Sequence, residues 1–252
     1  MWTRDQIKRH AKLFLKANYG TAFAVTLIAT LLGASRNSLE VVQRFDGVKL
    51  PRIDDLLITF NSGGDTPFQW LMNLFGNFFS GLFGMLSISL FVIFLVLRIV
   101  VTNNIRVGQA RYFTKAIAGD TKFDYLFSSF RNGEWSKHAV KLFQLDVTIF
   151  LWSLLLVIPG IVKTYQYKFV PYILSDHPDF SLQRAKDIST QMTNDDKLNL
   201  FILDLSFIGW YLLASLLPGI GHFLVEPYPQ ATEATLYRIK LEMIRVVGSD
   251  VL

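Results

Sequence analysis

Long apolar runs separated by short charged segments dominate the pattern of hydrophobic and polar positions along this chain. Residues 17–35, 66–97 and 205–225 contain no Asp, Glu, Lys or Arg. A bilayer core is crossed by about 20 mostly apolar helical residues. The pattern therefore predicts an all-α fold, a polytopic transmembrane helical bundle of about six spans, built from repeated helical hairpins with amphipathic interfacial helices.

The first charged segment predicts an amphipathic helix on the membrane surface. Thr3 and Gln6 have the spacing of a capping box, in which each side chain binds a free backbone N–H at the helix start. Such a helix either recognises lipid or a partner, or only anchors the chain with its positive side in the cytoplasm. The candidate membrane-surface anchor consists of the basic residues Arg4, Lys8, Arg9, Lys12 and Lys16.

Residues 18–34 then predict the first span, with a cleaved signal peptide as the alternative because "LLGAS" resembles a cleavage site. A polar loop follows at 35–67. The next apolar run predicts an interfacial helix near 68–78 and a span near 81–101. Between residues 106 and 141, seven basic residues against three acidic ones place the chain in the cytoplasm.

Two stretches, "LDVTIFLWSLLLVIPGI" and "LDLSFIGWYLLASLLPGI", share one pattern. A shift of 58 residues aligns Asp146 and Trp152 with Asp204 and Trp210, and Pro-Gly-Ile ends both stretches. This spacing predicts an internal duplication of a hairpin. We interpret Pro-Gly as the end of each outgoing helix, and the polar segments 161–177 and 219–237 as returning spans.

Three hairpin units therefore divide one integral membrane domain, 1–252. The first unit is 1–118, with the polar loop 35–67; the second is 119–177 and the third is 178–252. Because each unit crosses the membrane twice, both termini are predicted to be cytoplasmic.

Composition supports the membrane class and excludes others. The chain is 51% hydrophobic and 18% charged, whereas soluble domains carry about 25% charged residues. It has no cysteine, which excludes disulfides and zinc–thiolate sites. The net charge of +5 is modest and the aromatics lie in apolar runs, which argues against a nucleic-acid partner. No cofactor is predicted.

The paired positions Asp146 and Asp204 are the first candidates for chemistry. An aspartate at the centre of a spanning helix costs about 2.5–3.5 kcal/mol on insertion scales, although the cost falls near the ends. The two carboxylates either form a proton or cation site or make structural pairs, for which Lys163 and Lys168 are candidates.

His222 and Glu226 share a helix face by their spacing of four, as two metal ligands would. No third ligand is evident, so we expect no metal site. The chain also has no His-Glu-x-x-His, Gly-x-Ser-x-Gly or phosphate-binding Gly-rich motif. We therefore expect that the protein is not an enzyme.

The stretches "FILDLSFIGWYLLASLLPGIG", "LLLVIPGIVKTYQYKFVPYILSDHPDFSLQRA" and "IKRHAKLFLKANYGTAFAVTLIATLL" resemble an uncharacterised family of bacterial integral membrane proteins, domain of unknown function 975. The resemblance covers nearly the whole chain. It implies a multi-pass protein of the bacterial cell membrane, and it implies no activity and no functional residues.

Three functions remain open at this point. The first is a transport-type protein or transporter subunit with a polar cavity formed by Asp146, Asp204, Lys163 and Lys168. The second is a membrane scaffold or interaction protein that engages lipid or another membrane protein, such as an exporter. The third is an intramembrane hydrolase that uses His222 or Glu226.

Overall fold

Helix α1 (Arg4–Leu31) begins with the capping box that the sequence predicts. The Thr3 hydroxyl accepts from the Gln6 amide at 3.4 Å, and the Gln6 side chain accepts from the Thr3 amide at 3.3 Å. The helix bends at Asn18, whose φ of −129° and ψ of 26° are not helical. The buried side of its first half consists of Ile7, Ala11 and Leu15.

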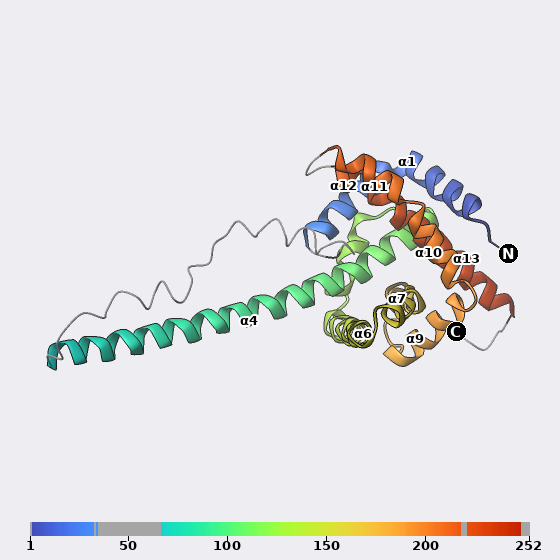
Figure 1. Ribbon diagram of the computed structural model, residues 1–252. Coiled ribbons are helices and arrows are strands. Elements are labelled where there is room, and N and C mark those ends of the chain that lie inside the picture. Colours follow the sequence, from blue (N-terminus) through green and yellow to red (C-terminus); the bar gives the residue numbers. More distant parts are fainter. Residues whose placement is uncertain (1, 33, 35–66, 218–220, 248–252) are drawn as a thin grey trace. The chain divides into compact units, whose positions relative to one another are not determined.

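The computed structural model describes residues 2–32, 34, 67–217 and 221–247 (Figure 1). The predicted loop 35–67 therefore lies outside the described residues except for its last residue, and so does Pro218-Gly219. All regular elements of the described part are helical. They fall into two compact units, Met1–Ser35 with Ile99–Leu252, and Arg36–Arg98.

After α1, the described elements continue with α4 and with a run of shorter helices. They are α4 (Pro67–Ile117), the 3-10 helix η1 (Phe123–Phe127), α5 (Ser128–Arg131), α6 (Trp135–Leu155), α7 (Val157–Gln166), α8 (Val170–Asp176), α9 (Leu182–Thr193), α10 (Lys197–Leu205), α11 (Ile208–Ser215), α12 (Gly221–Val225) and α13 (Pro227–Val247). Helix α9 follows its N-cap Ser181 and buries one side, which includes Ala185, Ile188 and Met192.

Four helical segments are long and apolar enough to cross a membrane, by length and composition. They are Arg4–Leu31, Asn73–Ile117, Trp135–Leu155 and Lys197–Ser215. The returning spans predicted at 161–177 and 219–237 are not among them. The first is divided between α7 and α8, and α13 carries charged residues along its length.

Helix α4 corrects the prediction of an interfacial helix followed by a separate span. The structure has one continuous helix, Pro67–Ile117. Ser80, Ser87 and Ser89 donate to carbonyls three or four residues earlier in the same helix, at 2.8 to 3.1 Å. Hydrogen bonds of this kind occur within α-helices. The glycines near these serines weaken the helix but do not end it.

The turn between α6 and α7 lies earlier than the sequence indicates. Leu156 has extended backbone angles, φ −158° and ψ 139°, and α7 begins at Val157. Pro159 therefore lies in the first turn of the returning helix, where its missing N–H costs no hydrogen bond. The prediction that Pro159-Gly160 ends the outgoing helix is wrong.

Gly160 lets α6 and α7 approach closely. A Cβ placed on Gly160 would lie 2.6 Å from the Cα of Ser153, seven residues earlier in the chain. The same spacing recurs between α11 and α12, where a Cβ on Gly221 would lie 2.7 Å from the carbonyl carbon of Ala214. Both hairpins therefore depend on glycine at the point of closest backbone approach.

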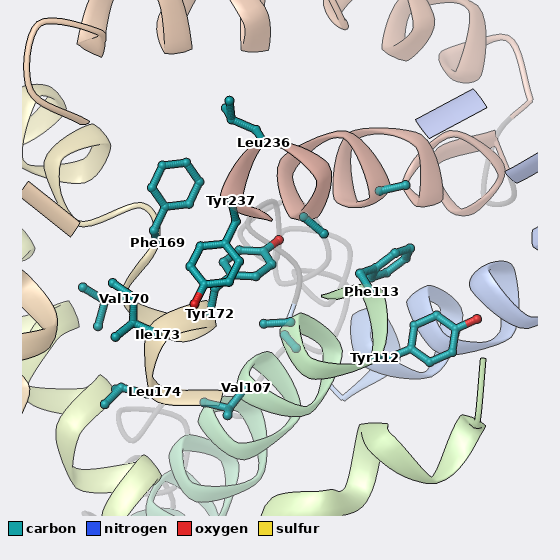
Figure 2. Packing of buried hydrophobic residues seen from close by; sticks show 14 of the residues in the cluster. Val107, Tyr112, Phe113, Phe169, Val170, Tyr172, Ile173, Leu174, Leu236 and Tyr237 are labelled. Atoms are coloured by element: carbon teal, nitrogen blue, oxygen red, sulfur yellow. The ribbon is translucent and has the colours of Figure 1, made fainter. Parts of the chain in front are cut away.

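Aromatic rings from α8 and α13 form the centre of the buried core in the larger unit. The rings of Tyr172 and Tyr237 stack with centroids 5.2 Å apart, and the Phe169 centroid lies 6.0 Å from that of Tyr237 (Figure 2). The Tyr237 hydroxyl donates to Asp176 at 2.9 Å. Helix α13 also packs along α1 (Figure 1).

Replacing Gly160 by alanine should destabilise the α6–α7 hairpin. The new methyl group meets the backbone of Ser153, and overpacking of this kind costs about 1–3 kcal/mol. The matched control is Gly209→Ala in α11, because nothing lies within 4 Å of a Cβ at Gly209. That control should be neutral or stabilised by up to about 1 kcal/mol through helix propensity. Unfolding titrations in detergent micelles measure both; equal effects would contradict the close-approach interpretation.

Candidate polar site

Asp146 lies on α6 and is held by an arginine of α4. The Nη1 of Arg106 donates to both carboxylate oxygens of Asp146, at 3.0 and 2.8 Å. The Asp146 side chain remains 45% exposed. Arg106 was not a candidate at the sequence level, since it was counted only in the basic excess that places residues 106–141 in the cytoplasm.

Asp204 lies on α10 and is held by a lysine that is almost completely buried. The Nζ of Lys168 donates to the two Asp204 oxygens at 2.8 and 2.9 Å. The Lys168 side chain is 3% exposed and that of Asp204 is 37% exposed. Each aspartate of the repeated pattern therefore pairs with a cation from an earlier segment, and Lys168 is one of the candidate partners.

Lys163 lies apart from both aspartate pairs. Its Nζ lies 5.2 Å from the ring centroid of Trp152 and 5.4 Å from that of Tyr167, within the range of cation–π attraction. Lys186 of α9 lies 5.4 Å from the same Tyr167 ring and donates to the Thr148 hydroxyl at 3.2 Å. Burial first, and the neighbouring Lys163 charge second, lower the pKa of Lys186.

His222 and Glu226 are adjacent, as their spacing predicts, with Nε2 3.5 Å from the carboxylate. Glu226 is buried and also accepts from Tyr211 at 3.1 Å and from Gln230 at 3.0 Å. Within the described ranges, no group of three or more His, Cys, Asp or Glu residues could hold a metal ion. Neighbouring side chains of the same bundle therefore hold the Glu226 carboxylate by hydrogen bonds.

The basic residues of α1 divide into two sets. Lys8 donates to the Ser206 hydroxyl and lies 4.7 Å from the Phe207 ring centroid, and Lys12 lies 5.8 Å from that of Tyr228. Lys8 is half-buried, whereas Arg4, Arg9, Lys12 and Lys16 are exposed, with Arg9 also paired to Asp5.

Asp196, just before α10, joins three distant parts of the chain. It accepts from the Trp2 indole at 3.0 Å and from Asn199 at 2.8 Å, and it pairs with Lys240 of α13. Burial disfavours its charge, but the hydrogen bonds from Lys240, Asn199 and Trp2 keep the pKa of Asp196 below its ordinary value. Sequence reasoning missed this residue because its partners are separated from it by long stretches of chain.

The protein is helical, and several of its helices are long and apolar enough to cross a membrane. These features are consistent with a membrane location. The chain belongs to the family described as "Protein of unknown function (DUF975)", whose model matches residues 1–242. The resemblance stated from the sequence is thereby confirmed. Neither the curated proteins nor the solved structures contain a match to the chain.

Replacing Lys168 by methionine should destabilise the protein by about 2–3 kcal/mol. Removal of one partner of a fully buried pair costs about 3–5 kcal/mol, and partial exposure of Asp204 reduces the cost. Asp204→Asn added to Lys168→Met should recover part of the loss, because the unpaired charge is then gone. The control is Lys137→Met, which breaks a pair with Asp179 whose side chains are 54% and 85% exposed, and should cost at most about 1 kcal/mol. Unfolding titrations in micelles test this; additive effects of the two changes would contradict a direct pair.

Proposed function

We propose that this chain is a non-catalytic membrane scaffold or interaction protein that engages anionic lipid and another membrane protein, such as an exporter. The exposed side of α1 is the observation that carries the proposal. Arg9 and Lys16 lie there on either side of Leu13, whose side chain is 67% exposed. An apolar residue between cations matches the boundary between headgroups and acyl chains of an anionic leaflet.

The aspartate pairs favour a scaffold over a transporter. Asp146 and Asp204 each bind a cationic side chain through both carboxylate oxygens. Because both oxygens of each carboxylate already accept from a cationic side chain, the pair must be disturbed before the carboxylate can bind a transported cation in its place. The pairs thus support the interpretation of these residues as structural.

Charge reversal on the exposed side of α1 should weaken binding of anionic lipid. Each basic residue near an anionic surface contributes about 1 kcal/mol, so Arg9→Glu and Lys16→Glu, which each change the charge by two units, should each lower the enrichment of phosphatidylglycerol over phosphatidylcholine by at least roughly fivefold. The measurement is the lipid that copurifies with the full chain from mixed micelles. The matched controls Arg9→Lys and Lys16→Arg keep the charge and should keep the enrichment. Equal enrichment in all four variants would overturn the proposal.

A transport-type function remains the second candidate, because both aspartate side chains are partly exposed while paired. A water-filled cavity reaching them would support it. The absence of native cysteine allows a direct comparison of the two functions.

Single cysteines at Asp146 and Asp204 distinguish the two functions. If the protein is a scaffold, a membrane-impermeant thiol reagent should label each of these positions from at most one side of a reconstituted bilayer. The control is a cysteine at Lys122, whose side chain is 72% exposed, which should react from one side. Reaction at both aspartate positions from both sides would favour transport and would lead to flux assays.

A further inference from the structure

Two lysines lie near the same aromatic ring at the base of the α6–α7 hairpin, where no carboxylate of the described residues pairs with them. Lys163 comes from α7 and Lys186 from α9, and their ammonium groups both lie 5.4 Å from the ring centroid of Tyr167. Helices α6, α7 and α9 lie together there (Figure 1). Two like charges at one ring repel each other unless an anion binds between or beside them.

The hydrogen bonds that these ammonium groups make within the protein are few. Lys163 has one to the Tyr167 hydroxyl at 3.5 Å, and Lys186 has one to the Thr148 hydroxyl at 3.2 Å. An ammonium group has three donors. The arrangement therefore has unused donor capacity for the oxygens of a phosphate group.

Beyond this base, the hairpin has an apolar surface that protein does not cover. Leu154, Val157 and Ile158 are 73%, 70% and 75% exposed. Thr148 lies seven residues before the end of α6 at Leu155, a rise of about 10 Å. Lys163 lies six residues after the start of α7 at Val157, a rise of about 9 Å. Both lysines thus lie at one level, and the tip beyond them is shorter than one leaflet of a hydrocarbon core of about 30 Å.

Part of the arrangement recurs near the second hairpin. Thr148 and Ser206 each follow the repeated aspartate by two residues, and each hydroxyl accepts from a lysine of an amphipathic helix, Lys186 or Lys8. Lys12 lies over Tyr228 as Lys186 lies over Tyr167. One lysine makes both contacts at the first hairpin and two lysines share them at the second, where no residue corresponds to Lys163, so the pair of cations at one ring is particular to the α6–α7 hairpin.

We propose that Lys163 and Lys186 bind the headgroup phosphate of an anionic phospholipid, whose acyl chains lie along the exposed apolar tip of the α6–α7 hairpin. The two ammonium groups supply charge, the Thr148 hydroxyl supplies a further polar contact, and the Trp152 ring lies 5.2 Å from the Lys163 ammonium, as expected of a tryptophan near the headgroups of a membrane. The inference deepens the proposed engagement of lipid, but it concerns residues separate from the exposed side of α1.

The test counts phosphatidylglycerol molecules bound to the full chain by native mass spectrometry from mixed micelles. The double variant Lys163→Gln/Lys186→Gln should bind one lipid fewer, with an affinity at this site lower by about tenfold or more. The control Lys163→Arg/Lys186→Arg keeps both charges and should keep the lipid. An unchanged number of bound lipids in the glutamine variant, with the fold intact, overturns the proposal.

Two comparisons separate this site from its alternatives. Arg9→Glu should leave this one bound lipid in place, so that failure of the α1 proposal and failure of the hairpin site give different results. Soluble glycerol phosphate should displace phosphatidylglycerol only weakly, because it lacks acyl chains to contact Leu154 and Ile158. Displacement by glycerol phosphate at equal affinity would indicate that the site binds a free phosphate compound and would overturn the proposal of a lipid ligand.

Discussion

The pairing of two aspartate carboxylates with cationic side chains joins parts of the chain that are distant in sequence. Asp146 on α6 binds Arg106, forty residues earlier, and Asp204 on α10 binds Lys168, thirty-six residues earlier. The first pair therefore fixes α6 against α4, and the second fixes α10 against the segment between α7 and α8. Lys168 is the buried partner of the second pair, so loss of Asp204 would leave a buried charge without its partner.

Local features of the fold could be predicted from the sequence, and partners distant along the chain could not. The capping box of Thr3 and Gln6 depends on four residues and is found as predicted. Arg106 was missed because a basic residue that flanks an apolar run has the same sequence pattern whether its side chain faces water or a carboxylate. The turn at Leu156 was misplaced because Pro159 can begin a helix as well as follow one, and the close approach of Gly160 to Ser153, which this turn brings about, is not visible in the sequence.

The surroundings of each lysine, more than its position in the sequence, decide what it can do. Lys163 and Lys168 lie five residues apart in one polar stretch, and both were candidates for the same site. Lys168 is buried against Asp204, so its charge is used within the protein. Lys163 lies between aromatic rings at the edge of an exposed apolar tip. The candidate polar site thus separates into a structural pair and a group open to an external anion.

The packing of α1 on α13 has a consequence for how the protein is made. Trp2 donates to Asp196, a residue 194 positions later, and Lys240 of the last helix binds the same carboxylate. During translation α1 leaves the ribosome long before either partner exists. Its capping box satisfies backbone N–H groups at the helix start, and Phe14 can already contact Phe113 of α4, but the side of α1 that packs on α13 has no partner until α13 is made. The packing of α1 on α13 therefore forms late, after all the helices between them have been made.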